Sequence, residues 1–358
     1  MTIINSLQKV WHKPLLQRGF RFSFAFLILA VLFTHVDLFQ VLQSFRAFEL
    51  WLLLPIMLSL FLMYFIQAYQ TSFGLKPLGM EVSVFRLFQI NLIASFYGLF
   101  LSTSLAGSIT WYKLANISKK SLEAGVLIVY FRLLNTLFVL LIGTLGIWFN
   151  LRSVSLSFVF ILIFLVISGF IAISPFFLPS VARLFEHLAK RFLLSWSIPV
   201  WIHSNGEKLW QAIISFHTLP VHIIVCSWSL SLFLNLVALL HVIFCAWAVG
   251  ISQPVYVIGW VYVIVYIASL FPISIGGLGV REVSIVVLLS NYGVAEAQAL
   301  SLSLSIFSFG VVVSVVGGLL EAWDVLSVKK TKKPNSAQAQ QPSGKYLVQE
   351  KPSEGNST

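Results

Sequence analysis

The stretch LFPISIGGLGVRE, residues 270–282, closes a run of seventy residues, 211–280, that contains no Asp, Glu, Lys or Arg. This run is far longer than the roughly 20 apolar residues that cross a bilayer core of about 30 Å. Its end combines one proline, three glycines and then the adjacent charges Arg281 and Glu282. Because proline and glycine interrupt helices, we expect the chain to leave regular membrane helix here and to begin a new helix with charge.

The whole chain has the composition of a polytopic membrane protein. Hydrophobic residues make up 58% of the 358 positions and charged residues only 10%, unlike a soluble domain. Lys and Arg exceed Asp and Glu by 11 and gather in short connectors and the tail, as in cytoplasmic loops that face anionic lipid. We therefore predict a multi-pass protein of the plasma membrane (the bacterial inner membrane) with both termini cytoplasmic. Membrane lipids are the expected partners, and nucleic acid is not.

Apolar segments of spanning length recur along the chain, and the absence of strand-like alternation predicts helices. We predict an all-α transmembrane bundle of about 7–9 membrane segments in residues 1–326, followed by a disordered Lys-rich cytoplasmic tail, residues 327–358. The candidate segments are residues 22–36, 50–69, 87–107, 124–149, 156–178, 222–249, 254–271 and 297–320, with a shorter piece at 283–289.

The connector WYKLANISKKSLE, residues 111–123, constrains the topology. Its three lysines would lie outside if residues 87–107 made a full crossing, which would break the positive-inside rule. A re-entrant or broken hairpin at residues 87–107 keeps both flanking loops inside, and we favour it over a plain crossing. The longest loop, residues 182–211, mixes apolar and basic residues at helical spacing and predicts an amphipathic helix at the cytoplasmic interface.

The opening stretch has a degenerate counterpart in the first half of the chain. When LSTSLAGSITWYK (101–113) is placed under FPISIGGLGVREV (271–283), Ser104 aligns with Ser274 and Gly107 with Gly277. Transporters carry paired interruptions of this kind near the bilayer midplane, where unwound segments can hold an anion. The alternative is that small residues are simply common in membrane helices. The pairing predicts two broken segments.

Arg132 is the only charged side chain between Glu123 and Arg152. A helix that starts near residue 122 places it roughly 15 Å deep at about 1.5 Å per residue, near the middle of the membrane. An arginine at this depth should face the bundle interior and have a partner. That partner is either a lipid phosphate, which the guanidinium fork fits, or an intramembrane acid; snorkelling from a shifted helix is the third reading.

Arg281 and Glu282 are sequence neighbours and point to different helix faces, so we expect them to be poor partners for each other. Glu282 lies in the first turn of the next helix, where the positive helix end favours a carboxylate, and it could neutralise Arg132 across the bundle. Arg281 would then be available for a lipid headgroup. The alternative is that both residues cap a helix at the cytoplasmic surface.

Asparagines are the remaining polar groups of interest in the spans. Asn91, Asn135 and Asn235 are expected to hold helices together, and Asn135 lies one turn from Arg132, where it could contact the same ligand. The sequence shows no metal-ligand cluster, nucleotide-binding loop or nucleophile–base pattern, so we expect no metal and no cofactor. The predicted substrate-binding residues are Arg132, Asn135, Ser274, Gly276, Gly277, Gly279, Arg281, Glu282, Ser104, Gly107 and Lys113.

The motif P-x-S-x-G-G-L-G-V-R-E at residues 272–282, followed by a short apolar segment, NYG and a small-residue-rich helix, resembles the lysylphosphatidylglycerol synthase transmembrane-domain family, also called the flippase-like domain family. The resemblance covers most of the chain up to about residue 327. The family's first-half motif has a proline, two glycines, an aspartate and an arginine. Here these positions hold Ser102, Ala106 with Gly107, Ser108 and Trp111, whereas VYFRLLN keeps the helix arginine as Arg132.

The best-known relatives join this membrane domain to a soluble domain that transfers an amino acid to phosphatidylglycerol, and the membrane part moves the product lipid between leaflets. Because the sequence has no such soluble domain, the resemblance implies lipid handling without aminoacyl transfer. We therefore expect a flippase that binds or moves an anionic phospholipid or polyprenyl-linked lipid. We favour a translocase over an enzyme. The alternatives are an intramembrane transferase, with Glu282 as its base, and a scaffold that contacts a lipid-modifying or glycan-synthesis enzyme.

Overall fold

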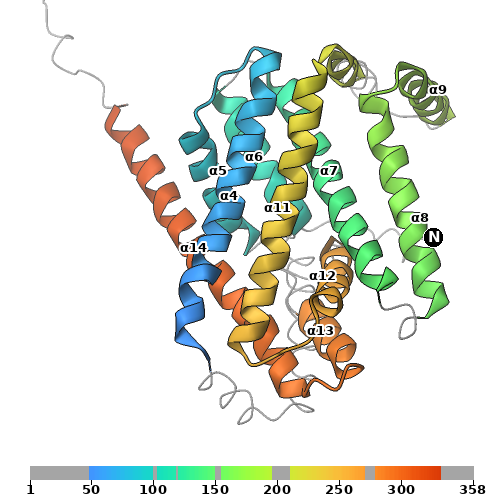
Figure 1. Ribbon diagram of the computed structural model, residues 1–358. Coiled ribbons are helices and arrows are strands. Elements are labelled where there is room, and N and C mark those ends of the chain that lie inside the picture. Colours follow the sequence, from blue (N-terminus) through green and yellow to red (C-terminus); the bar gives the residue numbers. More distant parts are fainter. Residues whose placement is uncertain are drawn as a thin grey trace, which may run out of the picture. The chain divides into compact units, whose positions relative to one another are not determined.

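The computed structural model describes residues 48–99, 103–117, 120–149, 155–195, 210–270 and 279–331, and the regular secondary structure in these ranges is helical (Figure 1). This confirms the predicted all-α class for the described part of the chain. The elements are η1 (Leu50–Leu52), α4 (Leu53–Leu75), η2 (Lys76–Leu78), α5 (Val84–Gly98), α6 (Thr103–Ile117), α7 (Ser121–Trp148), α8 (Leu156–Ile173), η3 (Ser174–Phe176), α9 (Pro179–Ser195), η4 (Ser215–Thr218), α11 (Val221–Ala248), α12 (Val255–Leu270), α13 (Val280–Ser290) and α14 (Glu296–Thr331).

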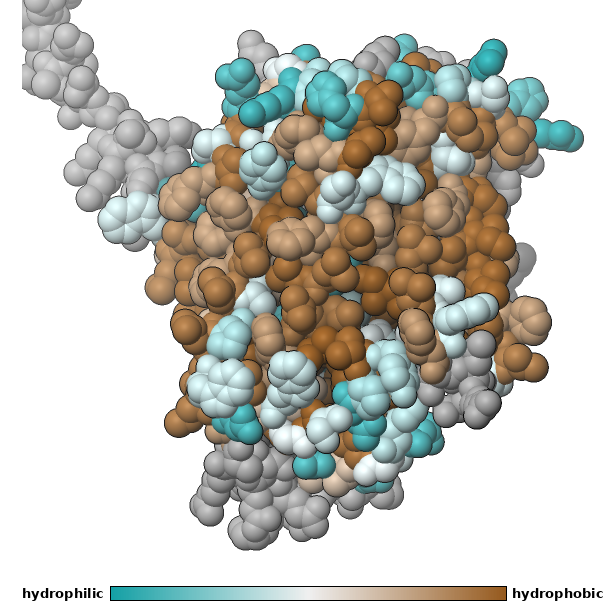
Figure 2. Space-filling model, in the orientation of Figure 1, coloured by the Kyte–Doolittle hydropathy of each residue, from teal (hydrophilic) through white to brown (hydrophobic). Residues whose placement is uncertain are grey.

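Five helical segments are long and apolar enough to cross a bilayer, and they coincide with predicted spans; the predicted span at 22–36 lies outside the described residues. The surface seen in Figure 2 carries a band of hydrophobic side chains, with hydrophilic side chains gathered above and below it. This pattern is that of a protein whose middle is solvated by lipid. The chain is therefore a multi-pass membrane protein, as predicted. The five segments are Leu50–Leu78, Leu122–Trp148, Leu156–Phe176, Val221–Ala248 and Glu296–Asp324.

The first hairpin consists of α5 and α6, which pack against each other. Each has 15 residues, about 22 Å at about 1.5 Å per residue, which is too short to cross a core of about 30 Å. Lys120, just after α6, donates from Nζ to the carbonyl oxygen of Leu78, just before α5, at 2.7 Å. The chain therefore enters and leaves this hairpin at one end of the bundle, and the broken geometry predicted for residues 87–107 is confirmed.

The second hairpin consists of α12 and α13, which have 16 and 11 residues and also pack together. Gln253, just before α12, donates from Nε2 to the carbonyl oxygen of Tyr292, just after α13, at 3.1 Å. The Tyr292 ring also packs against Trp260, with the centroids 6.0 Å apart. The helix α12 is therefore one arm of a hairpin and not the full crossing predicted for residues 254–271.

The two hairpins start from opposite ends of the bundle. The backbone N–H of Glu49, at the start of the first long span, donates to the carbonyl oxygen of Ala248 at the end of α11 (3.2 Å). The second hairpin follows Ala248 directly, whereas the base of the first lies at Leu78, beyond the far end of α4. The 23 residues of α4 separate these ends by about 34 Å. Figure 1 accordingly shows α5 and α6 in the upper half of the bundle and α12 and α13 in the lower half.

Two further segments relate to the predictions. The helix α9 begins the loop predicted to be amphipathic, and it exposes Leu184 and Leu188 beside the exposed Arg183 and Arg191; residues 196–209 lie outside the described part. Residues from Glu321 onward form a separate compact unit, of which the structure describes the helix up to residue 331. The helix α14 thus runs past residue 327, the predicted start of the tail.

Candidate functional site

A cavity of about 450 Å³ lies where the two hairpins meet the long spans. It receives side chains from all four hairpin helices and from α4, α7 and α14, so both halves of the sequence build it. The lining residues are Tyr64, Gln67 and Thr71 of α4, Asn91, Ala94, Ser95, Gly98 and Leu99 of α5 and its end, Gly107 and Thr110 of α6, Ile128, Phe131, Arg132 and Asn135 of α7, Tyr266 of α12, Arg281 of α13, and Ile306, Phe307, Gly310 and Ser314 of α14.

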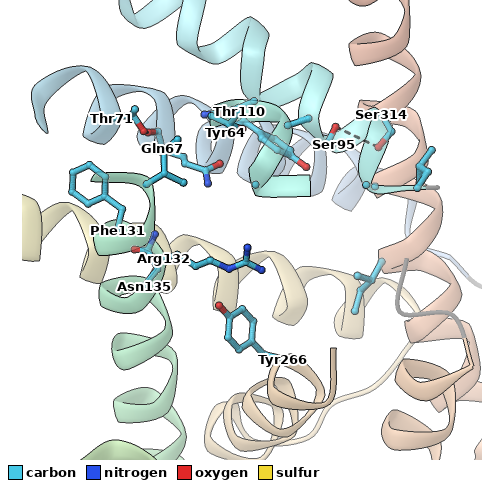
Figure 3. A pocket seen from close by; sticks show the side chains of 18 of the residues that line it. Tyr64, Gln67, Thr71, Ser95, Thr110, Phe131, Arg132, Asn135, Tyr266 and Ser314 are labelled. Atoms are coloured by element: carbon cyan, nitrogen blue, oxygen red, sulfur yellow. Dashed lines mark hydrogen bonds between the residues drawn. The ribbon is translucent and has the colours of Figure 1, made fainter. Parts of the chain in front are cut away.

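Arg132 reaches into this cavity from α7, and Figure 3 shows its guanidinium extended across the space above Tyr266. Gly107 of the first hairpin faces it closely: a Cβ atom at this glycine would lie 3.2 Å from Nη1 of Arg132. Any larger residue at position 107 would press on the guanidinium. The glycine therefore leaves room for a cation beside the first hairpin, which gives the predicted glycine of the repeat a physical role.

Arg281 lines the same cavity from the second hairpin, and it is held from two sides. Its guanidinium forms an ion pair with the Glu282 carboxylate, with Nη2 2.5 Å from Oε1. The guanidinium carbon lies 5.2 Å from the centre of the Phe307 ring, within cation–π range. The salt bridge and the aromatic ring thus hold this side chain, which is 12% exposed, at the wall of the cavity.

The expectation that Arg281 and Glu282 are poor partners is wrong. Glu282 is fully buried at the start of α13, where its Oε2 accepts from the backbone N–H of Gly279 at 2.6 Å. Ser303 of α14 donates to Oε1 at 3.2 Å and accepts from Nε of Arg281 at 3.1 Å. Because the helix end and Ser303 anchor the carboxylate, the long arginine side chain can turn back to it, although the two Cα–Cβ bonds diverge.

The same contacts argue against the hypothesis that Glu282 neutralises Arg132. Both carboxylate oxygens are already engaged within the second hairpin and by α14. Among the described residues, Glu282 pairs with Arg281 and not with Arg132. Gly279 supports this arrangement with a φ of 85°, a left-handed conformation that a residue with a side chain rarely adopts, so the glycine is required by the turn into α13.

The other side of the cavity is neutral and polar. Tyr266 shares a hydrogen bond with Thr136 (3.0 Å), and Ser314 donates to Ser95 (3.3 Å) between α14 and α5, as Figure 3 shows for the second pair. Two amide atoms, Nδ2 of Asn91 and Oδ1 of Asn135, are buried without a hydrogen-bond partner in the described part of the chain. Both atoms are enclosed by the packing of α5 and α7, so the helix-holding role expected of these asparagines stays a prediction.

The structure gathers only part of the predicted site. Gly107, Arg132, Asn135 and Arg281 line one cavity, with Gly279 and Glu282 directly behind Arg281. Lys113, one turn beyond Thr110 on α6, does not line it, because the helix carries it toward the hairpin base. Residues 274, 276 and 277 lie outside the described part, and Ser104 is described only through its backbone in α6.

Several lining residues had not been predicted. Gln67 and Thr71 of α4 and Asn91 of α5 are polar residues within apolar helices, a signal that marks them as facing protein and not lipid. The sequence alone gives no reason to connect α4 with the second hairpin, which begins about 180 residues further along the chain. Tyr64 and Ser314 carry no such local signal, since single aromatic or small residues are common in membrane helices.

An apolar pocket of about 330 Å³ adjoins the second hairpin. It is lined by α8, α12 and Val280, the residue that directly precedes Arg281. Consecutive residues at the start of α13 therefore line two pockets of different character, one polar and cationic and one purely hydrocarbon. Its lining residues are Phe158, Ile161, Leu162, Leu165, Ile264, Ile267, Ala268 and Val280.

Comparisons with known proteins give one match. No curated protein and no solved structure shows significant similarity to this chain. A family model described as the lysylphosphatidylglycerol synthase TM region matches residues 19–318, which include both hairpins, the long spans up to residue 318 and every residue that lines the cavity. The chain therefore belongs to the family of lysylphosphatidylglycerol synthase TM regions.

Proposed function

We propose that this protein binds the headgroup of an anionic lipid in the cavity and moves that lipid between the two leaflets of the membrane. The observation that carries the proposal is the convergence of Arg132 and Arg281 on one cavity between two opposed hairpins. The lipid is a phospholipid or a polyprenyl-linked lipid, and the protein is a translocase and not an enzyme.

The charge of the cavity supports an anionic ligand. The described lining residues include two arginines and no Asp or Glu. Residues 100–102 and 271–278, which lie outside the described part, also contain no acidic residue in the sequence. Arginine within a membrane is costly unless it serves a partner or a ligand, and its planar fork matches the oxygens of a phosphate. A phosphate is thus the ligand group that this lining fits best.

The fold supports passage between leaflets. Half-length helices that enter from opposite ends and interrupt near the middle are a recurring device of transporters. The apolar pocket beside Val280 offers a surface for hydrocarbon next to the headgroup site. The sequence has no nucleotide-binding loop, so the movement is either passive or coupled to an ion gradient.

We place this activity in the plasma membrane, with the basic end of the bundle in the cytoplasm. The base of the first hairpin, with Lys76 and Lys120, and the start of α7 lie at one end. Positive residues favour the cytoplasmic side of a membrane. This orientation puts the first hairpin in the cytoplasmic half of the membrane and the second in the opposite half.

The transferase alternative has weaker support. A transferase that acts on lipid-linked substrates needs a general base at the cavity. Glu282, the carboxylate beside Arg281, is fully buried and its oxygens are engaged by Gly279, Arg281 and Ser303. It therefore serves to hold Arg281 in place. The scaffold alternative predicts no lipid movement at all.

Reconstitution in liposomes tests the proposal. Purified protein is placed in vesicles that contain fluorescent phosphatidylglycerol, fluorescent polyprenyl phosphate or fluorescent phosphatidylcholine, and a membrane-impermeant quencher reports lipid movement. We expect movement of the anionic lipids, and its loss in Arg132→Gln. Arg183→Gln, an exposed arginine of α9 outside the cavity, is the matched control and should keep full activity.

Three outcomes separate the candidate functions. Movement that depends on Arg132 but not on Arg183 supports the translocase. A new covalent lipid product, detected by mass spectrometry, supports the transferase. Vesicles in which correctly folded protein produces neither movement nor product contradict both activities and leave the scaffold.

A further inference from the structure

The residues that line the cavity are not spread evenly between the two ends of the bundle. On α4, Thr71, Gln67 and Tyr64 lie 4, 8 and 11 residues before the end of the helix at Leu75, near the base of the first hairpin. At about 1.5 Å per residue, these positions are about 6, 12 and 17 Å from that end. The α4 wall of the cavity therefore runs from near this end to the middle of the bundle.

The lining stops well short of the other end. Among the described lining residues, Arg281 comes nearest to the base of the second hairpin, and it lies nine residues before the end of α13 at Ser290, about 14 Å from that end. Beyond it, buried apolar side chains of α13 and α14 belong to one core cluster, including Ile285, Leu289 and Leu300. Packed hydrocarbon thus closes the cavity toward the base of the second hairpin.

Gln67 indicates that the other half of the cavity is accessible. Its side chain is exposed although it lies within a long apolar span, and Figure 3 shows its amide across the cavity from Arg132. The opposite face of α4 carries Tyr69, which is 43% exposed and does not line the cavity. Because a polar group that faces hydrocarbon at this depth is costly, the exposed surface of Gln67 indicates that water or a headgroup reaches this wall.

The chemistry of the wall changes with depth. Arg132 lies 11 residues into α7 from Ser121, about 17 Å deep, so Gln67 is about 5 Å nearer to the base of the first hairpin. The side-chain amide of Gln67 has no hydrogen-bond partner among the described residues. It can donate to a phosphate oxygen, but a neutral donor binds an anion less strongly than a guanidinium does. A headgroup that enters from this end therefore meets a weak donor first and a strong one beyond it.

We propose that the cavity receives its anionic headgroup from the leaflet on the side of the first hairpin's base, and that Gln67 is the residue of α4 that contacts the headgroup on its way to Arg132. The cavity is closed to the opposite leaflet in this conformation by the apolar core of the second hairpin. This inference rests on the proposed function, since it assigns a side of entry and a positioning residue to the same site.

Cysteine labelling tests the side of entry without requiring lipid movement. In the full-length protein without its two native cysteines, Gln67→Cys is compared with Tyr69→Cys in oriented vesicles treated with a membrane-impermeant maleimide. Asn116→Cys and Asn291→Cys, exposed positions at the bases of the first and second hairpins, report the two sides.

We expect Gln67→Cys to be labelled about tenfold faster from the Asn116 side than from the Asn291 side. Tyr69→Cys is the matched control because it lies six residues before Leu75, about 9 Å deep, and hence nearer to the membrane surface than Gln67. It should remain unlabelled from both sides, since its side chain faces lipid. Labelling of Gln67→Cys from the Asn291 side, or as slowly as Tyr69→Cys, would overturn the inference.

Charge at position 67 tests the contact with the headgroup. Gln67→Glu places a carboxylate on the route of a phosphate and should slow the movement of fluorescent phosphatidylglycerol or polyprenyl phosphate about tenfold or more, whereas Gln67→Leu should slow it a few-fold. Gln89→Glu is the matched control, because Gln89 lies on α5 outside the cavity and its side chain already accepts from Arg86. It should move lipid as the wild type does.

Thermal unfolding checks that the variants are folded, and Gln67→Leu should unfold near the wild-type temperature because no described hydrogen bond of this side chain is lost. Movement at the wild-type rate in folded Gln67→Glu would overturn the role of Gln67.

Failure of the proposed function gives a different result. A wild-type protein that moves no lipid, with Gln67→Cys labelled from the Asn116 side and more slowly when phosphatidylglycerol is added to phosphatidylcholine vesicles, supports the entry route without translocation. Lipid movement by a protein whose Gln67→Cys variant is not labelled supports translocation and overturns the entry route.

Discussion

The two hairpins reach one cavity from opposite ends of the bundle, but they contribute different chemistry. The described residues of the first hairpin that line the cavity are uncharged, and Gly107 leaves space for a cation that α7 supplies, Arg132. The second hairpin carries its own cation, Arg281, and the carboxylate that holds it. The repeated fold therefore places positive charge on both sides of the cavity by two means: a glycine that admits an arginine from a neighbour, and an ion pair within the hairpin.

This difference predicts that the two hairpins respond differently to mutation. In the second hairpin, Arg281 both lines the cavity and neutralises a buried carboxylate, so its loss should lower stability and ligand binding together unless Glu282 is also replaced. In the first hairpin, Gly107 affects the ligand only through the position of Arg132, so its replacement should weaken ligand binding with little loss of stability.

The largest expected effect is on the second hairpin. Arg281→Gln leaves the carboxylate of Glu282 buried without its ion-pair partner, which should cost about 3–5 kcal/mol of unfolding free energy. The double variant Arg281→Gln with Glu282→Gln removes the buried charge and should regain most of that stability, but not the binding of anionic lipid. Thermal unfolding in detergent, followed by lipid binding, measures both. If the single and double variants are equally unstable, the ion pair is not what fixes this hairpin.

The next effect tests the cavity that both hairpins share. Gly310 of α14 lines it, and a Cβ atom at this position would meet nothing within 4 Å. Gly310→Leu should fill part of the cavity and weaken anionic-lipid binding about tenfold or more, while the unfolding temperature stays near that of the wild type. Gly310→Ala, with only one added carbon, should have a small effect. Unchanged binding in the leucine variant would place the lipid site elsewhere.

A smaller effect is expected in the first hairpin. Gly107→Ala puts a methyl group 3.2 Å from Nη1 of Arg132, so the guanidinium must shift and lipid binding should weaken a few-fold. Gly259→Ala on α12 is the matched control, since its methyl group makes ordinary contact with Leu239 at 3.8 Å. Lipid titrations of the two variants side by side measure the difference. Equal binding by both would show that Gly107 does not set the position of Arg132.

The smallest effects concern the hairpin bases. Lys120→Met removes the hydrogen bond to Leu78, and Gln253→Met removes the bond to Tyr292. Each change should cost about 1 kcal/mol, the net worth of a typical hydrogen bond. Hydrogen exchange should speed up in the altered hairpin and remain unchanged in the other. Faster exchange in both hairpins would indicate that they are mechanically coupled.

Much of the fold follows from the sequence, because the length of an apolar segment and the charges that flank it determine locally whether that segment crosses the membrane. Counting lysines in residues 111–123 was enough to predict the first broken hairpin, and the interrupted motif at 271–283 indicated the second. Arg132 and Arg281 were identified because charge within hydrocarbon is rare. The same reasoning wrongly predicted that α12 crosses the whole membrane, since a long apolar run does not reveal where the chain reverses direction.

The candidate site was predicted less completely, for two physical reasons. Side-chain direction was inferred from ideal helix geometry, which does not account for a flexible arginine turning back to an anchored neighbour, as Arg281 does to Glu282. The contributions of Tyr64 and Ser314 depend on which spans pack together, and a single sequence contains no local signal of that. The binding roles of Ser274, Gly276 and Gly277 stay predictions, because residues 271–278 lie outside the described part.

The central claim is that the two hairpins enter from opposite sides of the membrane, and cysteine accessibility tests it most directly. In a background that lacks Cys226 and Cys245, single cysteines replace exposed residues on either side of each hairpin: Glu81 and Asn116 for the first, and Ser252 and Asn291 for the second. A membrane-impermeant maleimide is applied to oriented vesicles. We expect the first two positions to be labelled from one side and the last two from the other. Labelling of all four from the same side, or of Glu81 and Asn116 from different sides, would contradict the account.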